Sequence, residues 1–483
     1  MQSHSSTFRP VRLGFAPTRR DVFSREDSVR QKQILLDLLR KWDIDFVDLG
    51  FLNEDGLLYD PADAPEVANQ FCAKGVDALF CPHCNFGTEE AAGKLAALTN
   101  LPLLLWGPRD AAPEPSGDRL RDTQCGLFAT SKILRRLGVP FTYIVNSFPD
   151  APVFERGLRN FLAASAVVRE FRNLRIGQVG TRPAGFSTVI CNEGELLERF
   201  GIEIIPKSLL EICNDAQSIS DSNSNEVRQD VEEMKRRFGA TSHSDEDLVR
   251  LAGFKFALLR WARKENLSAI ALQCWSALQD ALRISACAVD SQITALGIPV
   301  ACETDIHGAV TAAMLHAALQ GSSPTFFSDL TVRHPTNDNA ELLWHCGVFP
   351  IELIAEGAQP KMTHHYILPT RCPGLSEFEI KGGDITIARF DGDHNEYSLF
   401  MGHMRGTEGP RTRGTYVWAE VDDWPRWEEH LIRGPYIHHV VGGHGKLAPI
   451  LYEACRYIPG LSPDPIDPNE QEIQAYWRGA DLI

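Results

Sequence analysis

One apolar run of the chain ends abruptly in three side chains that could do chemistry. Residues 297–302 read GIPVAC, which is typical of a buried strand, and Glu303, Asp305 and His307 follow at alternate positions. Carboxylates and an imidazole at the end of a strand can bind a metal ion or move protons. A single acid at such a position is more often the N-cap of the next helix, so the pattern needs support from elsewhere.

Further polar clusters follow other apolar runs. They contain Asn85, Arg182, Gln273 with Trp275, Asp329, His345 and, near the C-terminus, Tyr436 with His439. In an open parallel sheet, ligands bind outside the carboxyl ends of the strands, so these clusters are expected to meet there. Carboxylates at neighbouring strand ends, with histidines downstream, suit Mn²⁺, Mg²⁺, Fe²⁺ or Co²⁺. The absence of an accompanying set of thiolates argues against structural zinc.

The composition excludes several classes of protein. The chain has 483 residues, and 64 acidic against 48 basic residues give a net charge of −16, which argues against a nucleic-acid binder. No apolar run is long enough for a signal peptide or a membrane span, so we expect a cytoplasmic protein without a membrane partner. The twelve cysteines are scattered, and we expect buried thiols, Cys72, Cys125, Cys287 and Cys302 among them, in a reducing interior. Cys81-Pro-His-Cys84 lacks the second ligand pair of a zinc site.

The order of apolar patterns predicts an α/β fold. Short apolar runs alternate with helical periodicity, as at 28–42, 76–82 and 101–107, and the pattern restarts near 174. Such alternation favours parallel sheets covered on both faces. We therefore expect two Rossmann-like, doubly wound parallel-sheet domains, at 1–172 and 173–350, followed by a mostly β, barrel-like C-terminal domain at 351–483.

Within this frame, three segments carry specific expectations. The polar stretch 215–227 reads as a surface loop. Residues 382–404 read as two strands joined by a DGDHN turn. The Pro-rich tail, PGLSPDPIDPNEQ, is expected to wrap a surface.

The sequence resembles the L-fucose isomerase and L-arabinose isomerase superfamily, most clearly from residue 270 onward. In that superfamily a strand-end Glu, a second acid and a C-terminal His bind a divalent metal. ETDIHG, FFSDLTVRHP and GPYIHHVVGGHG then imply Glu303, Asp329 and His439 as ligands. An Asp at position 329 resembles the second ligand of fucose isomerases, whereas arabinose isomerases have Glu there. WHCGVFP resembles the segment that supplies a further His in arabinose isomerases, which implies His345 here, although fucose isomerases do not use that ligand in the same way.

The resemblance also implies substrate contacts. LGFAPTRRDVFSREDS resembles an Arg-bearing loop that closes over the sugar from a neighbouring subunit, which points to Arg19 and Arg20. Gln273 and Trp275 occupy a strand end where family members contact the sugar. The remaining candidates for substrate contact are Asn85, Arg182, His307 and Tyr436. His307 and Asp305 could also support the metal ligands from behind. The loop CPHCNFGTEEAAGKLA differs from both named enzymes, so the sugar stays open.

By this resemblance we expect an aldose–ketose isomerase that acts on a free sugar, a deoxyhexose, pentose or related compound, through an enediol. A metal, with Mn²⁺ expected first, polarises the carbonyl, and Glu303 and Asp329 serve as the acid/base pair. A homohexamer is expected. One alternative keeps the metal but performs epimerisation or carbon–carbon cleavage. Another is a cytoplasmic sugar-binding protein without catalysis, which would not need three metal ligands together.

Overall fold

The computed structural model describes residues 8–239 and 243–482, and these divide into two compact units. Unit 1 consists of Glu170–Leu451 and Pro459–Pro468, with Phe8 added. Unit 2 consists of Arg9–Arg169, Tyr452–Ile458 and the C-terminal segment from Asn469. Two short C-terminal segments therefore belong to the same unit as the N-terminal third of the chain.

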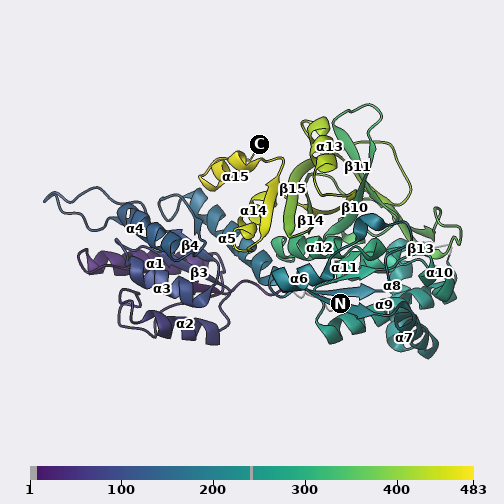
Figure 1. Cartoon of the computed structure of the whole chain (residues 1–483), viewed down its shortest axis with the longest axis horizontal. Coiled ribbons are helices and arrows are strands. Elements are labelled where there is room, and N and C mark those ends of the chain that lie inside the picture. The colour runs from purple at the N-terminus through teal and green to yellow at the C-terminus, as the bar shows by residue number, and fades with distance from the viewer. Residues whose placement is uncertain (1–7, 240–242, 483) are drawn as a thin grey trace. The chain divides into compact units, whose positions relative to one another are not determined.

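Unit 2 is built on a parallel sheet with the order β2-β1-β3-β4-β5 (Figure 1). Its strands are β1 Leu13–Phe15, β2 Phe46–Val47, β3 Ala78–Pro82, β4 Leu103–Trp106 and β5 Thr142–Tyr143. Its helices are α1 Arg25–Lys41, α2 Ala64–Ala73, α3 Glu89–Thr99, α4 Thr123–Arg136, nearly all of α5 Pro152–Phe171, the end of α14 Ala448–Cys455, and α15 Glu470–Trp477.

Both faces of this sheet are apolar and covered, which is why its strands read as continuous apolar runs. Leu79 and Leu105 belong to a buried cluster that includes side chains of α2, α3 and α4. Phe80 and Trp106, which alternate with them along the strands, pack against Phe154 of α5 at ring-centroid distances of 6.0 and 4.0 Å. The first predicted α/β layer is thus confirmed.

Unit 1 contains a second parallel sheet, of order β7-β6-β8-β9, and a larger sheet. The parallel strands are β6 Arg175–Val179, β7 Glu203–Lys207, β8 Ala269–Leu272 and β9 Val300–Ala301. The helical elements in this part are η1 Ser187–Val189, α6 Glu193–Phe200, α7 Leu209–Ser222, α8 Asn225–Phe238, α9 Asp245–Glu265, α10 Ala277–Leu282, α11 Cys287–Ala295, η2 Cys302–Thr304 and α12 Ile306–Ala318. Helix α12 packs against β8 and β9 and also against β14 and β17 of the larger sheet.

The expectation of a surface loop at 215–227 is wrong. Helices α7 and α8 fill the segment, and the chain turns between them at Asn223, which has a left-handed backbone with φ 40°. The side chain of Ser224 then caps α8 by accepting a hydrogen bond from the Val227 amide. Ile219 and Val227 bury one face of each helix, while the many polar residues face outward. Ser and Asn act here as caps and as exposed helical residues rather than as loop residues.

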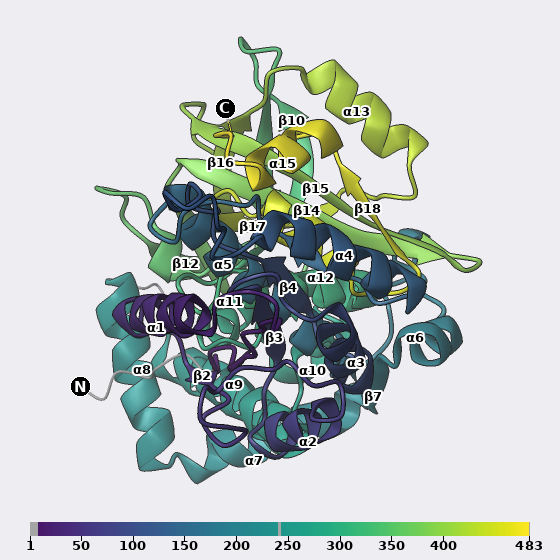
Figure 2. The ribbon, with the colours of Figure 1, turned by 90° about the vertical axis from the view of Figure 1, so that its left-hand side faces the viewer.

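The larger sheet of unit 1 forms a barrel, which is most easily followed in Figure 2. Its strands are β10 Phe326–Arg333, β11 Ala340–His345, β12 Lys361–His364, β13 Pro373–Glu379, β14 Asp384–Asp393, β15 Glu396–Thr407, β16 Thr415–Glu420, β17 His439–His444 and β18 Leu461–Pro465. The order is β12-β13-β16-β11-β10-β17-β14-β15-β18, and β15 also pairs with β16, which closes the ring. The short helix η3 Ile351–Leu353 and α13 Trp424–Arg433 lie in its connections.

The barrel confirms the predicted hairpin and corrects the predicted tail. Strands β14 and β15 pair antiparallel across a two-residue turn, His394–Asn395, whose positive φ angles suit a primed hairpin turn. The Pro-rich tail contains β18, which pairs in parallel with β15 instead of only lying on a surface. The fold class is as predicted, although the barrel begins at Phe326, before residue 350. Among the described residues, no helix combines the length and apolarity needed to cross a membrane.

Candidate active site

Glu303 lies just beyond β9, where the chain leaves the parallel sheet. The strand ends at Ala301, and Cys302 begins the turn η2. Glu303 itself has φ 55° and ψ 24°, a left-handed conformation that L residues other than Asn and Asp seldom adopt. Its carboxylate is buried, and Oε1 accepts a hydrogen bond from Nε1 of Trp275 at 3.1 Å. The sequence predicted a strand that ends in a functional acid, and the strained backbone aims that acid inward.

Strand register brings Asp329 and His439 together. Strand β10 pairs antiparallel with β17, and Asp329 stands directly opposite His439. Oδ1 of Asp329 lies 3.5 Å from Nε2 of His439, which in turn lies 3.7 Å from Oε2 of Glu303. Three predicted ligands from η2, β10 and β17 therefore converge within one unit.

Asp305 holds His439 in one orientation. Oδ2 of Asp305 lies 2.9 Å from Nδ1 of His439, and an ionised carboxylate can only accept a hydrogen bond. Nδ1 must therefore carry the proton, which leaves the lone pair of Nε2 facing Glu303 and Asp329. Asp305 also caps α12 by accepting a hydrogen bond from the Gly308 amide at 2.9 Å. Asp305 is thus a helix cap, as acids after strands often are, and it also orients His439.

A buried ion-pair chain continues behind Asp305. Arg389 on β14 is fully buried and pairs with Asp305 and with Asp391 on the same strand. Asp391 accepts a hydrogen bond from Nδ1 of His307 at 3.0 Å. Burial would raise the pKa of Asp305, but Arg389 and His439 outweigh it and hold that pKa far below its usual range. Asp305 is therefore charged at any working pH.

Sequence reasoning missed Arg389 and Asp391, although a signal was present. They stand two residues apart in ITIARFDGD, an otherwise apolar strand, so both side chains point to one face. Opposite charges alternating within a buried strand indicate an internal ion pair, because an unpaired buried charge is costly.

His345, the further ligand implied by resemblance, lies at the end of β11. Its Nε2 is 3.7 Å from Oε2 of Glu303. Its Nδ1, however, accepts a hydrogen bond from the backbone amide of Cys346 at 2.9 Å. Burial would lower the pKa of His345, but Asp329, Cys346 and Glu303 raise it well above its usual value. Since Nδ1 accepts, the ring holds its proton on Nε2, toward Glu303.

Two carboxylate oxygens at this place have no hydrogen-bond partner among the described residues. Oε2 of Glu303 and Oδ1 of Asp329 are buried and make no hydrogen bond with any described residue. Burial would raise the pKa of Glu303, but the imidazoles of His345 and His439 lower it to about 2. A carboxylate that is ionised, buried and incompletely bonded needs a positive partner. The free oxygens and the lone pair of His439 are hard ligands that fit a divalent cation, and the exposed His438 lies close enough to join Asp329 and His439.

The other unit 1 candidates have varied surroundings. Gln273 accepts a hydrogen bond from the Thr181 amide at 3.1 Å, which ties the end of β8 to the turn that carries the exposed Arg182. His307 faces Asp391, and its buried Nε2 makes no hydrogen bond among the described residues. Tyr436 bonds through its hydroxyl to Ser398 and Asp464. The substrate roles of these residues stay predictions.

Arg19, Arg20 and Asn85 lie in unit 2 and shape one loop. Asn85 accepts a hydrogen bond from the Arg20 amide at 2.8 Å and donates one to the Arg20 carbonyl at 3.0 Å. The guanidinium of Arg20 pairs with Glu89, and that of Arg19 pairs with Asp21. Asn85 thus supports the loop that carries both arginines, whose contact with a sugar stays a prediction.

The cysteines are free thiols throughout the described residues, and most are buried. Cys72 and Cys125 are exposed, contrary to expectation, because their helices turn these positions to solvent. Between Cys81 and Cys84, Nε2 of His83 bonds to Thr130 at 2.8 Å. Burial raises the pKa of Cys81 to about 12, so this segment belongs to the core of unit 2.

Comparison with known proteins finds similar sugar isomerases. Residues 14–172 match the model of the fucose/sulfoquinovose isomerase N-terminal domain. Sulfoquinovose isomerase from Alkalicoccus urumqiensis is 28% identical over 345 residues, which cover 71% of this chain and 75% of that protein. The predicted resemblance of the chain to the fucose/sulfoquinovose isomerase superfamily is therefore confirmed. Sulfoquinovose isomerase from Priestia aryabhattai is likewise 28% identical, over 72% of this chain and 76% of its own length.

Likeness to solved structures adds nothing to this assignment. An ABC transporter periplasmic solute binding protein from Actinobacillus succinogenes with bound D-allose is 14% identical and covers 65% of this chain and 92% of its own. Its TM-score of 0.17 is too low to bear on the fold or the function.

Proposed function

We propose that the protein is a metal-dependent aldose–ketose isomerase, with sulfoquinovose as the first substrate to test. The observation that carries the proposal is the convergence of Oε2 of Glu303, Oδ1 of Asp329 and Nε2 of His439. The substrate comes from the relatives, which are named sulfoquinovose isomerases. The similarity to this superfamily supports isomerase chemistry over simple sugar binding.

In this proposal Glu303, Asp329 and His439 would hold the metal, and Mn²⁺ is the first candidate. A bound divalent ion supplies Lewis acidity that makes the hydrogen next to a sugar carbonyl acidic enough to remove. Asp305 keeps the lone pair of His439 available by accepting the proton of Nδ1. Because Arg389 is buried against Asp305, this acceptor cannot swing away.

Glu303 and Asp329 would also move the protons. Isomerisation takes a proton from one of C1 and C2 and returns one to the other, while a hydroxyl proton moves between the oxygens. Oε2 of Glu303 and Oδ1 of Asp329 make no hydrogen bond among the described residues, and both lie near Nε2 of His439. Trp275 fixes the other oxygen of Glu303, so its free oxygen keeps a set direction. The same two groups would serve as acid and base, each through an oxygen that the metal leaves free.

His345 takes a different role in this proposal. A ring nitrogen that carries a proton cannot ligate a metal, and the bond from the Cys346 amide keeps the proton of His345 on Nε2. We therefore assign His345 as a donor that supports the negative charge of Glu303, outside the ligand set.

Proton exchange tests the proposal directly. Metal-stripped protein is incubated in D₂O with sulfoquinovose, L-fucose or L-arabinose, with and without Mn²⁺, and deuterium at C1 and C2 is followed by NMR. We expect Mn²⁺-dependent label together with a new ketose, and none with Glu303→Gln. Label without a new ketose would indicate epimerase or lyase chemistry. Full turnover of sulfoquinovose by Glu303→Gln would refute the assignment.

A further inference from the structure

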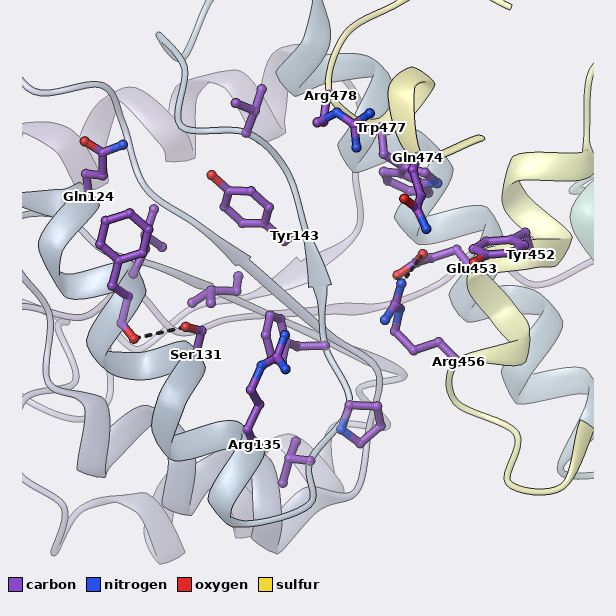
Figure 3. Close-up of a pocket in the computed structure, with 17 residues that line it drawn as sticks. Gln124, Ser131, Arg135, Tyr143, Tyr452, Glu453, Arg456, Gln474, Trp477 and Arg478 are labelled. Carbon is purple, nitrogen blue, oxygen red and sulfur yellow. Dashed lines mark hydrogen bonds and ion pairs between the residues drawn. The ribbon is translucent and has the colours of Figure 1, made fainter. Parts of the chain in front are cut away.

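Unit 2 contains a cavity that has no part in the proposed reaction. Its volume is about 670 Å³, within the range of pockets that hold small molecules. Figure 3 shows Ser131 and Arg135 of α4 on one side, and Trp477 and Arg478 at the end of α15 on the other. Every residue that lines it belongs to unit 2, so the cavity is complete within that unit.

Three donors in this cavity lack partners. The guanidinium groups of Arg135 and Arg478 form no hydrogen bond or ion pair with residues 8–239 or 243–482. Nε1 of Trp477 is buried and likewise has no acceptor among those residues. Buried donors are nearly always satisfied, so this indole N–H calls for an acceptor from outside the chain.

The nearby acid does not neutralise these arginines. Glu453 lines the same cavity, but Arg456 donates to it at 2.8 Å and Thr142 at 2.7 Å. Arg135 and Arg478 therefore remain as unbalanced positive charge in a chain whose net charge is −16. Unbalanced guanidinium groups in a concave site attract phosphate or sulfonate groups.

The remaining wall is apolar and partly aromatic. Leu105, Val139, Phe141 and Tyr143 contribute side chains, in addition to the indole of Trp477. Planar rings favour flat ligands, because stacked and edge contacts with them are attractive. The site thus combines an anion-binding side with an aromatic wall.

We propose that this cavity binds a small organic anion in which a phosphate or sulfonate group is attached to a planar body. Arg478 and the indole N–H of Trp477 bind the anionic group, and Arg135 adds positive charge from the opposite side. The planar body contacts Phe141 and Tyr143. The binding depends on charge and therefore weakens as salt rises.

Calorimetry on the full chain tests this site, with Glu303→Gln as the background so that sugar turnover plays no part. The probes are AMP and naphthalene-1-sulfonate, with adenosine as the neutral counterpart of AMP. We expect at least one anion to bind with 1:1 stoichiometry, and adenosine to bind at least roughly tenfold more weakly than AMP if AMP is the ligand. Binding of AMP alone identifies a nucleotide-like phosphate, and binding of naphthalene-1-sulfonate alone identifies an aryl sulfonate.

Variants then locate the site. Arg135→Gln combined with Arg478→Gln should weaken binding at least about tenfold. Binding should also change the fluorescence of Trp477, and Trp477→Phe should remove that change. Arg136→Gln is the matched control, because Arg136 is exposed on the same helix but does not line the cavity. The proposal is overturned if neither anion binds, if Arg136→Gln weakens binding equally, or if self-association of the chain abolishes binding.

Discussion

The end of β11 and the start of β17 each present a histidine to the same oxygen. Nε2 of His345 and Nε2 of His439 both lie 3.7 Å from Oε2 of Glu303. The two rings differ in the partner of the other ring nitrogen, Nδ1. A carboxylate accepts the proton of Nδ1 in His439, whereas a backbone amide donates to Nδ1 in His345. Equal distances therefore conceal opposite chemistry, a lone pair at one strand and a proton at the other.

In both histidines the hydrogen-bond partner of Nδ1 decides whether Nε2 offers a lone pair or a proton. Strand β17 gains its acceptor from Asp305, which is itself fixed by α12 and Arg389. Strand β11 ends at His345, and the chain turns so that the next amide points back at the ring. The contrast makes a graded set of experiments possible.

The largest effect is expected for His439→Gln. The change removes the one imidazole lone pair that faces both acids, so Mn²⁺ affinity should fall more than about 100-fold and turnover should be lost. Calorimetric titration of metal-stripped protein with Mn²⁺ measures the first, and a ketose assay measures the second. Unchanged affinity in a folded variant would end the assignment of β17 as a ligand strand.

Asp305→Asn comes next, because it acts on the metal only through His439. An amide can donate to Nδ1, which would move the proton to Nε2 and make the β17 histidine resemble the β11 histidine. Mn²⁺ affinity should fall about 10- to 100-fold. The variant also leaves Arg389 with one fewer partner, so its free energy of unfolding should drop by about 3 kcal/mol. Asp393→Asn, an exposed acid at the end of β14, is the control.

A smaller change in metal affinity is expected for His345→Gln. The amide of Gln still donates toward Glu303, so Mn²⁺ affinity should stay within about threefold, while kcat falls about 100-fold because an amide N–H is a weaker proton donor than the imidazole N–H. Parallel titrations of the two histidine variants compare the strands directly. A loss of affinity equal to that of His439→Gln would indicate that both histidines are ligands and would contradict the proposed difference between them.

The smallest effect is expected at the other end of β11, at Glu341. Burial raises the pKa of Glu341 to about 7, and one of its oxygens has no hydrogen bond among the described residues. Above pH 4.5 the folded state therefore holds a proton that the unfolded state has lost, so this residue makes stability fall as pH rises toward 7. Glu341→Gln should be neutral near pH 4 and should stabilise the protein by about 1 to 3 kcal/mol at pH 8. Thermal unfolding at both values checks the sign, and an equal effect at both would contradict it.

The sequence predicted the alternation of strands and helices well, because apolar runs such as 76–82 and 101–107 are continuous where both faces of a sheet are covered. It also indicated Glu303 as a candidate, since an acid after a buried strand breaks the apolar pattern. It could not give the register that sets Asp329 opposite His439, because register depends on pairing between segments far apart in the chain. Nor could it show that a backbone amide fixes the proton of His345.

Polar residues led to a wrong loop prediction at 215–227, and those in β14 held a signal that the sequence analysis did not use. The stretch 215–227 is polar because its helices expose those residues, not because it is a loop. Arg389 and Asp391 were passed over because a strand with charges inside looks like a strand with charges outside until its neighbours are known. In both cases burial, which depends on the whole fold, decided the meaning of a polar residue.

The left-handed backbone at Glu303 has a consequence for how this protein can change. Glycine would relieve the strain at φ 55° and would remove a buried carboxylate oxygen that has no hydrogen bond among the described residues. The most stabilising residue at position 303 is thus not the one that the proposed reaction needs. A laboratory selection for heat resistance alone would favour Glu303→Gly and would lose the proposed reaction, whereas alternating selection for turnover would preserve a residue that the fold by itself does not favour.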